Sequence, residues 1–129
     1  MDELVASARQ LLGKFELGEG RSAGSVAAAL RTEAGHIYTG ISLNLDCGIG
    51  FCAEHSAVAE MLKQRETRIA EIVAVGADGI RPPCGRCREL LLQVSPANTH
   101  TRVAIAEGQA VALRELLPHH WLDDEADQA

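Results

Sequence analysis

The chain has 129 residues, a formal net charge of −6 and 47% hydrophobic residues. This length predicts one domain, residues 1–129, that buries about two thirds of its unfolded surface. The acidic balance, with one Trp, one Tyr and two Phe, argues against a nucleic-acid partner, which normally needs a basic stripe and aromatic stacking platforms. We therefore expect a small free substrate.

The sequence gives no indication of a membrane partner. No apolar run approaches the roughly 20 residues of a membrane-spanning helix, and the acidic start Met1-Asp2-Glu3 lacks the basic region of a signal peptide. We expect a soluble, cytoplasmic protein. In that compartment four cysteines are more often thiols and metal ligands than a disulfide framework.

The first predicted element is an amphipathic helix from about Asp2 to Leu17, ended by Gly18 and Gly20. Its apolar residues recur at helical spacing: Leu4, Ala8, Leu11, Leu12 and Phe15. Two short apolar runs follow, at 26–31 and 36–41. The turn-forming residues between them predict a β-hairpin.

The middle of the chain alternates between helix and strand patterns. A loop over 46–50 leads into a helix predicted from Ala53 to Lys63. The run 69–75 is rich in β-branched residues and interrupted only by Glu71, which predicts a buried central strand. A second helix is predicted over 86–94.

The last elements complete the prediction of fold class. Strands are predicted at 103–106 and 110–113, and the segment Asp123 to Ala129 is expected to be solvated and frayed. Alternating strands and helices predict an α/β fold, a three-layer α/β/α sandwich around a mixed sheet of about five strands.

Two short motifs about thirty residues apart carry the chemistry: Cys52-Ala53-Glu54 and Pro83-Cys84-Gly85-Arg86-Cys87. They offer three thiolate ligands and one carboxylate. Zinc held by three protein side chains keeps a tetrahedral position for water, as in catalytic rather than structural sites. Beside that water, Glu54 can move a proton.

Both motifs are expected at helix starts. Cys84 and Cys87 share one face if they open a helix, and Pro83 suits the position just before it. Because residues two apart in an ideal helix diverge by about 200°, Cys52 and Glu54 can face one metal only if Cys52 is the helix cap. The positive end of a helix dipole stabilises thiolates at such positions.

The paired motifs resemble those of the zinc nucleoside and nucleobase deaminases. Further segments follow in the order seen in the small cytidine deaminases, so the resemblance covers nearly the whole chain. Within that group the sequence looks closest to blasticidin-S deaminase. The matching segments are 25–30, 35–40, 52–54, 83–91 and 114–118.

The resemblance implies a zinc-dependent hydrolase, active as a homotetramer, that deaminates cytidine, deoxycytidine, a blasticidin-S-like aminonucleoside or another aminated heterocycle. Glu54 would be the proton shuttle. The backbone N–H of Ala53 would face the carbonyl of the base, and the carbonyl of Pro82 would contact the amino group. The implied Zn²⁺ ligands are Cys52, Cys84 and Cys87.

Departures from the family pattern fall in the substrate pocket. Cytidine deaminases usually carry Asn-x-Glu on the second strand, where this chain has Ser42 and Asn44. Their aromatic-Pro pair is replaced by Gly24-Ser25. Trp121 stands where the family often places an aromatic that reaches a neighbouring subunit's pocket, although packing of the C-terminal segment also explains it. The identity of the substrate therefore stays open.

The charge of the metal site raises a second question. Zinc with three thiolates carries a formal charge of −1, and many small cytidine deaminases have an arginine directly after the catalytic glutamate. Here His55 stands at that position. Arg86, between the two cysteines, is the expected substitute, as in blasticidin-S deaminase; the alternative is that Arg86 simply faces solvent.

Cys47 supports a competing hypothesis. Lying five residues before Cys52, it could complete a structural site of four thiolates and leave Glu54 without a role. A related alternative is a zinc or redox binding module that uses Cys84 and Cys87 without hydrolysis.

Overall fold

A computed structural model describes residues 1–122, and the frayed tail predicted at 123–129 lies outside the described residues. The α-helices are α1 (Asp2–Leu11), α2 (Ala53–Lys63), α3 (Gly85–Val94) and α4 (Leu113–Leu116). The strands are β1 (Phe15–Gly18), β2 (Arg21–Thr32), β3 (Ile37–Asn44), β4 (Ile69–Gly76), β5 (Gly79–Arg81), β6 (Arg102–Ala106) and β7 (Gln109–Ala112). Two 3-10 helices, η1 (Asp46–Gly48) and η2 (Pro96–His100), join them.

The seven strands form one mixed sheet. Its five main strands run in the order β3-β2-β4-β6-β7, because β2 pairs with β3 along one edge and with β4 along the other. The short strands β1 and β5 extend the sheet beside the ends of β2 and β4. β4 and β6 are parallel, and the other neighbours are antiparallel. The five main strands confirm the predicted mixed sheet of about five strands, and the two short strands add to it.

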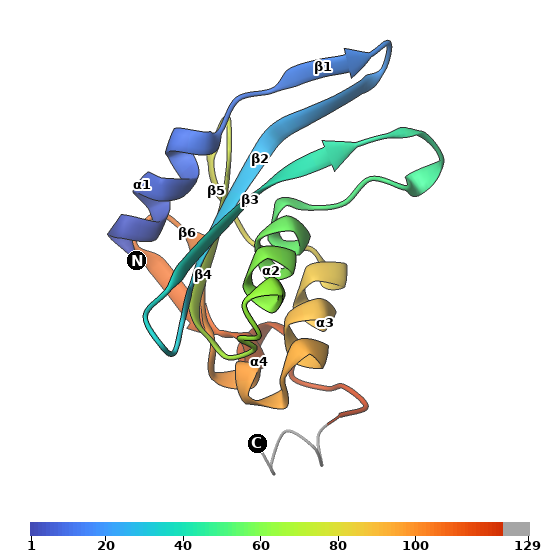
Figure 1. The fold of residues 1–129 in the computed structure, drawn as a ribbon. Coiled ribbons are helices and arrows are strands. Elements are labelled where there is room, and N and C mark those ends of the chain that lie inside the picture. Colours follow the sequence, from blue (N-terminus) through green and yellow to red (C-terminus); the bar gives the residue numbers. More distant parts are fainter. Residues whose placement is uncertain (123–129) are drawn as a thin grey trace.

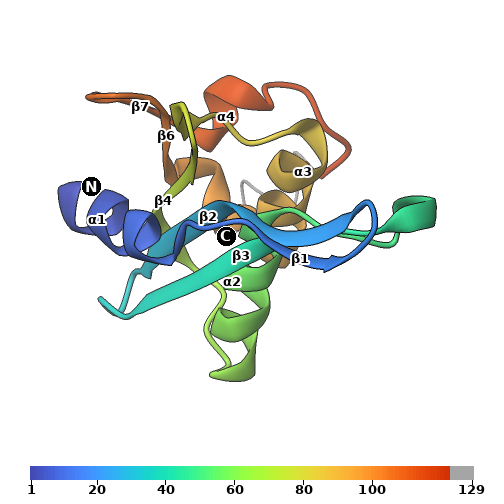
Figure 2. The same cartoon turned by 90° about the horizontal axis from the view of Figure 1, so that it is seen from above.

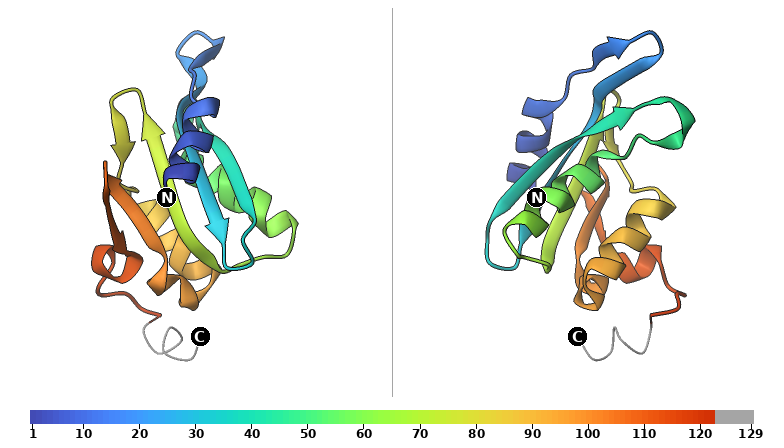
Figure 3. Two further views of the ribbon diagram at one scale, coloured as in Figure 1. Left: turned by 90° about the vertical axis from the view of Figure 1, so that its left-hand side faces the viewer. Right: turned by 45° about the vertical axis from the view of Figure 1, so that its right-hand side comes forward.

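Side chains of β2 and β4 alternate between two buried layers, as the period of two of a strand requires. One layer, under α1, contains Leu4, Val5, Ala8, Ala27, Ala29, Val73, Val75 and Ala104. The layer under α2 and α3 includes Ala28, Leu30, Ala57, Val58, Met61, Ile72, Ala74, Leu91 and Leu92. Figure 3 shows α1 on one face of the sheet and α2 and α3 on the other, so the predicted three-layer arrangement is confirmed.

The first helix is shorter than the sequence predicts. It ends at Leu11, because Leu12 adopts an extended conformation and the N–H of Gly13 donates to the carbonyl of Gly24 at 3.0 Å. The chain then enters β1, whose Phe15 is more than half exposed. Helical spacing of apolar residues therefore misled the prediction beyond Leu11, since the last of them are not buried on a helix face.

Helix α2 packs very closely on β3. A Cβ atom at Gly40 would lie 2.4 Å from the backbone nitrogen of Ala57, so glycine is needed there. The first turns of α2 and α3 lie at the same end of the sheet (Figure 1). None of the described helices is long and apolar enough to cross a membrane.

Candidate active site

Three thiols meet where α2 and α3 begin. Cys52 and Cys84 are the N-cap residues of the two helices, and Cys87 is buried in the first turn of α3. The Sγ atoms of Cys52 and Cys84 are 3.7 Å apart, those of Cys84 and Cys87 3.6 Å, and all three lie within 4.8 Å of one another. The expected cap position of Cys52 is confirmed.

The spacing of these sulfur atoms fits a metal ion. Two Zn–S bonds of about 2.3 Å at the tetrahedral angle place their sulfurs about 3.8 Å apart. Cys47 is exposed, lies in η1 at the outer edge of the molecule (Figure 2), and is not in the group. Within residues 1–122 the group therefore holds three thiols, and a four-thiolate site including Cys47 is not formed.

The thiols are not poised to ionise together without a cation. Burial raises the pKa of Cys87, and the nearby charge of Glu54 adds to this. Burial is also the main reason why the pKa of Cys52 is raised. Burial acts in the same direction on Cys84, but hydrogen bonds from the Cys87 backbone and neighbouring groups outweigh it, so the pKa of Cys84 is lowered. Metal binding at such a group displaces protons from the thiols.

Glu54 lies beside the thiols in the first turn of α2, with 6% of its surface exposed. Burial raises the pKa of its carboxyl group, partly offset by a hydrogen bond from its own backbone and by contact with the Cys87 thiol. A raised pKa makes a carboxyl group better suited both to accept and to donate a proton.

His55 also contacts one of the thiols. Its Nδ1 atom lies 3.6 Å from Sγ of Cys87. Burial, and secondly the charge of Arg86, lower the pKa of His55, so the imidazole is neutral near pH 7. Arg86 itself is exposed. Of the two residues considered for offsetting the thiolate charge, His55 makes a contact with a sulfur atom, and Arg86 is an exposed residue of the cavity lining.

A cavity of about 630 Å³ opens onto this group. It brings together most of the residues predicted from sequence for the site. Those that line it are Ser42, Asn44, Cys52, Ala53, Glu54, Pro82, Cys84 and Arg86. Buried Cys87 lies behind the lining.

One wall of the cavity is a small hydrogen-bonded polar patch. The N–H of Val26 donates to Oγ of Ser42 at 3.0 Å, and the hydroxyls of Ser25 and Ser42 are 3.3 Å apart. Nδ2 of Asn44 donates to Oγ of Ser25 at 3.3 Å. The hydroxyl of Ser42 is thus engaged within the wall.

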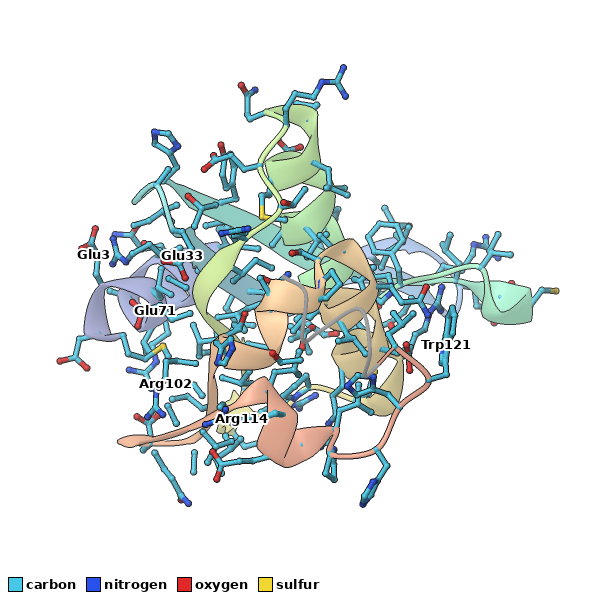
Figure 4. The ribbon with its side chains drawn as sticks, turned by 90° about the horizontal axis from the view of Figure 1, so that it is seen from below. Glu3, Glu33, Glu71, Arg102, Arg114 and Trp121 are labelled. Carbon is cyan, nitrogen blue, oxygen red and sulfur yellow. The ribbon has the colours of Figure 1, made fainter. Side chains whose placement is uncertain are left out.

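Two residues lie outside the set that was both predicted and found in the cavity lining. Trp121 is 75% exposed and is not among the cavity-lining residues; it lies at the periphery of the molecule (Figure 4). Arg81, which the sequence analysis did not single out, does line the cavity. No local sequence pattern marks Arg81, because only the pairing of β5 with β4 brings it to the cavity.

Comparisons with known proteins agree with this geometry, although no family model matches. The chain is 34% identical over 98 residues to a cytidine deaminase of Halalkalibacterium halodurans, covering 72% of this chain and 74% of the relative. It is 32% identical over 71 residues to a cytidine deaminase of Mycobacterium tuberculosis, covering 54% of this chain and 53% of that one.

Solved structures that are similar to this chain are also cytidine deaminases. The crystal structure of cytidine deaminase from Mycobacterium tuberculosis superposes with a TM-score of 0.77 at 25% identity, covering 93% of this chain and 95% of that one. The cytidine deaminase from Bacillus anthracis gives a TM-score of 0.74 at 25% identity, covering 98% and 93%. Together with the Halalkalibacterium relative, these matches show that the chain belongs to the cytidine deaminase family of hydrolytic deaminases.

Proposed function

We propose that this protein is a zinc-dependent hydrolase that removes the amino group of a free cytosine-type nucleoside or a related aminonucleoside and releases ammonia. The observation that carries the proposal is the group of three thiols at metal-binding separation beside buried Glu54, all at one cavity. Membership of the family supports deamination. The metal and the substrate are the proposed parts.

Cys52, Cys84 and Cys87 would hold the zinc ion. When bound, zinc lowers the pKa of a water molecule toward neutrality and so makes a nucleophile available near pH 7. Helix N-termini at Cys52 and Cys84 favour the thiolate forms that the ion requires. As a neutral imidazole, His55 can donate its Nδ1–H to the thiolate of Cys87. We assign to this hydrogen bond the task of offsetting the thiolate charge.

Glu54 is the proton carrier in this proposal. It takes a proton from the attacking water and delivers it to the ring nitrogen. It then takes the second proton, from the hydroxyl group now on the ring carbon, and delivers it to the amino group, which leaves as ammonia while the ring carbonyl forms, so one carboxyl group serves each step in turn. Its burial supports the role, because the raised pKa of Glu54 lets the protonated form persist closer to the operating pH.

Backbone groups would orient the ring. Ala53 is the first residue of α2, and the first N–H groups of a helix have no partner within the helix, so this N–H is suited to donate to the carbonyl of the base. The carbonyl of Pro82, on the cavity wall, is suited to accept from the amino group.

The polar wall would hold the sugar. Asn44 and Ser42 line it, and an uncharged amide binds a hydroxyl group less strongly than the glutamate usual in the family. We further propose a cytoplasmic homotetramer, in which Trp121 contacts a neighbouring copy. The 75% exposure of the Trp121 side chain supports this, because an exposed tryptophan is typical of an interface.

The proposal is tested by measuring ammonia release from cytidine, deoxycytidine, cytosine and blasticidin S. Each reaction is run with the zinc-loaded protein, after removal of the metal by a chelator, and after zinc is added back. We expect release from at least one nucleoside, loss of activity with the chelator and recovery with zinc. Zinc-loaded protein that releases no ammonia from any of the four would instead favour a zinc binding module without hydrolysis.

A further inference from the structure

The cavity carries positive charge that the proposed reaction does not fully use. Arg81 and Arg86 line it, and Glu54 is the sole acidic residue among the described residues of the lining. Arg86 acts on His55 at the thiol end. The proposed reaction gives Arg81 no task. The lining also includes the uncharged polar residues Ser25, Ser42 and Asn44.

Arg81 is held in place by the β4–β5 hairpin. It is the last residue of β5, and its guanidinium lies directly over Gly76, where a Cβ atom would be 2.4 Å from Nε. Nη2 donates to Oδ1 of Asp78 at 3.1 Å. This is its one hydrogen bond within the described part of the chain, and a guanidinium has five N–H donors. Most of its donors are therefore available to a ligand.

Strand register places Arg81 beside the wall assigned to the sugar. Gly76, under the guanidinium, pairs with Val26 of β2. The N–H of Val26 in turn donates to Ser42. Arg81 thus adjoins the polar wall, where the part of a nucleoside beyond its ring would lie.

The existing partner of Arg81 does not block such a ligand. The side chains of Arg81 and Asp78 are 50% and 83% exposed, and ion pairs in contact with water are weak. A carboxylate or phosphate can instead make two parallel hydrogen bonds to one guanidinium, which is the geometry that arginine favours.

We propose that Arg81 is a specificity-determining residue that binds an anionic group, a carboxylate or a phosphate monoester, carried by the sugar of the substrate. This proposal rests on the proposed function, because it takes the amino-bearing ring to lie at Glu54. The preferred substrate class is then a cytosine nucleoside with an acidic sugar substituent rather than neutral cytidine.

The test compares binding and turnover for matched neutral and anionic ligands. Binding of uridine, uridine 5′-monophosphate and uridine 5′-carboxylic acid to the zinc-loaded protein is measured by calorimetry, and deamination is measured with the three corresponding cytosine compounds. The variants are Arg81→Gln and Arg81→Lys. The control is Arg114→Gln, an exposed arginine of α4 outside the cavity lining (Figure 4).

We expect at least one anionic product to bind about tenfold more tightly than uridine, as one hydrogen bond to a charged group provides. The ratio of the Kd of uridine to the Kd of the anionic product should fall to near one in Arg81→Gln and to an intermediate value in Arg81→Lys. In Arg114→Gln the ratio should not change. The larger of the carboxylate and phosphate ratios identifies the preferred group.

A ratio near one in the unmodified protein, or a ratio unchanged in Arg81→Gln, would overturn the assignment of Arg81. Deamination of cytidine without any preference for anions would do the same and leave the proposed function standing. Anion binding that depends on Arg81 without deamination of any of the three compounds would contradict the proposed function and keep the Arg81 site.

Discussion

Helix α2 has a functionally different carboxyl group at each end. Glu54 lies in its first turn, where burial raises the pKa of the carboxyl group. Glu66 follows shortly after its last turn, where hydrogen bonds, first from Tyr38 and then from Thr32, lower the pKa of Glu66 to about 2. The comparison shows that the balance between burial and hydrogen-bond donors decides whether the pKa of a carboxyl group is raised or lowered.

The Glu66 end is a structural anchor. Its carboxylate accepts hydrogen bonds from the Tyr38 hydroxyl and, at 2.9 Å, from Nδ1 of His36. These residues belong to the β2–β3 hairpin region, so the contacts tie that hairpin to the chain leaving α2. The anchored end fixes the helix, while the other end carries Glu54 beside the thiols.

The largest effect is expected from removing a thiol. Cys87→Ala should retain less than about 0.1 zinc per chain, because two protein ligands are fewer than the three that hold a catalytic zinc ion, and deamination should be abolished. Zinc content by atomic emission and ammonia release are measured on the same sample. The matched control Cys47→Ala should keep both, since Cys47 lies outside the group. Loss of zinc in Cys47→Ala would contradict the three-thiol site.

Substitution of His55, which also lies at the thiol end of α2, is expected to have a smaller effect. His55→Ala should weaken zinc binding about 10- to 100-fold, as losing a hydrogen bond to a metal ligand commonly does, and should shift the absorption bands of the Co²⁺-substituted protein. His55→Gln, which can still donate, should restore part of the affinity. Arg86→Gln is the comparison. If it weakens zinc binding more than His55→Ala does, Arg86 and not His55 offsets the thiolate charge.

The two ends of α2 differ in how much of their structure could be predicted from the sequence. Cys52, Glu54 and Cys84 could be placed from sequence because a helix cap and its first turn are local features, set by periodicity and short motifs. The anchor at Glu66 depends on Tyr38, which a hairpin fold brings across the chain, so no local pattern signals it. Arg81 was missed for the same reason, since β5 is three residues long and only its pairing with β4 brings Arg81 to the cavity.

Glu66→Gln should affect stability rather than catalysis. Because the folded pKa of Glu66 is about 2 and its ordinary value 4.5, the charged form stabilises the fold above about pH 4.5, and this contribution is lost as the pH falls toward 2. Thermal unfolding should therefore show a lower Tm for Glu66→Gln at pH 7 and a shrinking difference from the unmodified protein in acid. A difference that grows as the pH falls would contradict the anchor.

The smallest effect is expected from Tyr38→Phe. This variant removes one hydrogen bond to Glu66 and keeps the ring and the remaining contacts of the carboxylate. Its Tm at pH 7 should lie between those of Glu66→Gln and the unmodified protein, with the rate of ammonia release unchanged. A change in rate at unchanged zinc content would show that the two ends of α2 are coupled.

The central claim is that Glu54 moves protons and Glu66 does not. The direct measurement is the rate of ammonia release from zinc-loaded Glu54→Gln and Glu66→Gln, with zinc content determined on each sample. The account predicts full zinc in both, a rate reduced by about a thousandfold or more in Glu54→Gln, as expected for loss of an essential acid and base, and a nearly normal rate in Glu66→Gln. Normal turnover by zinc-loaded Glu54→Gln would contradict it.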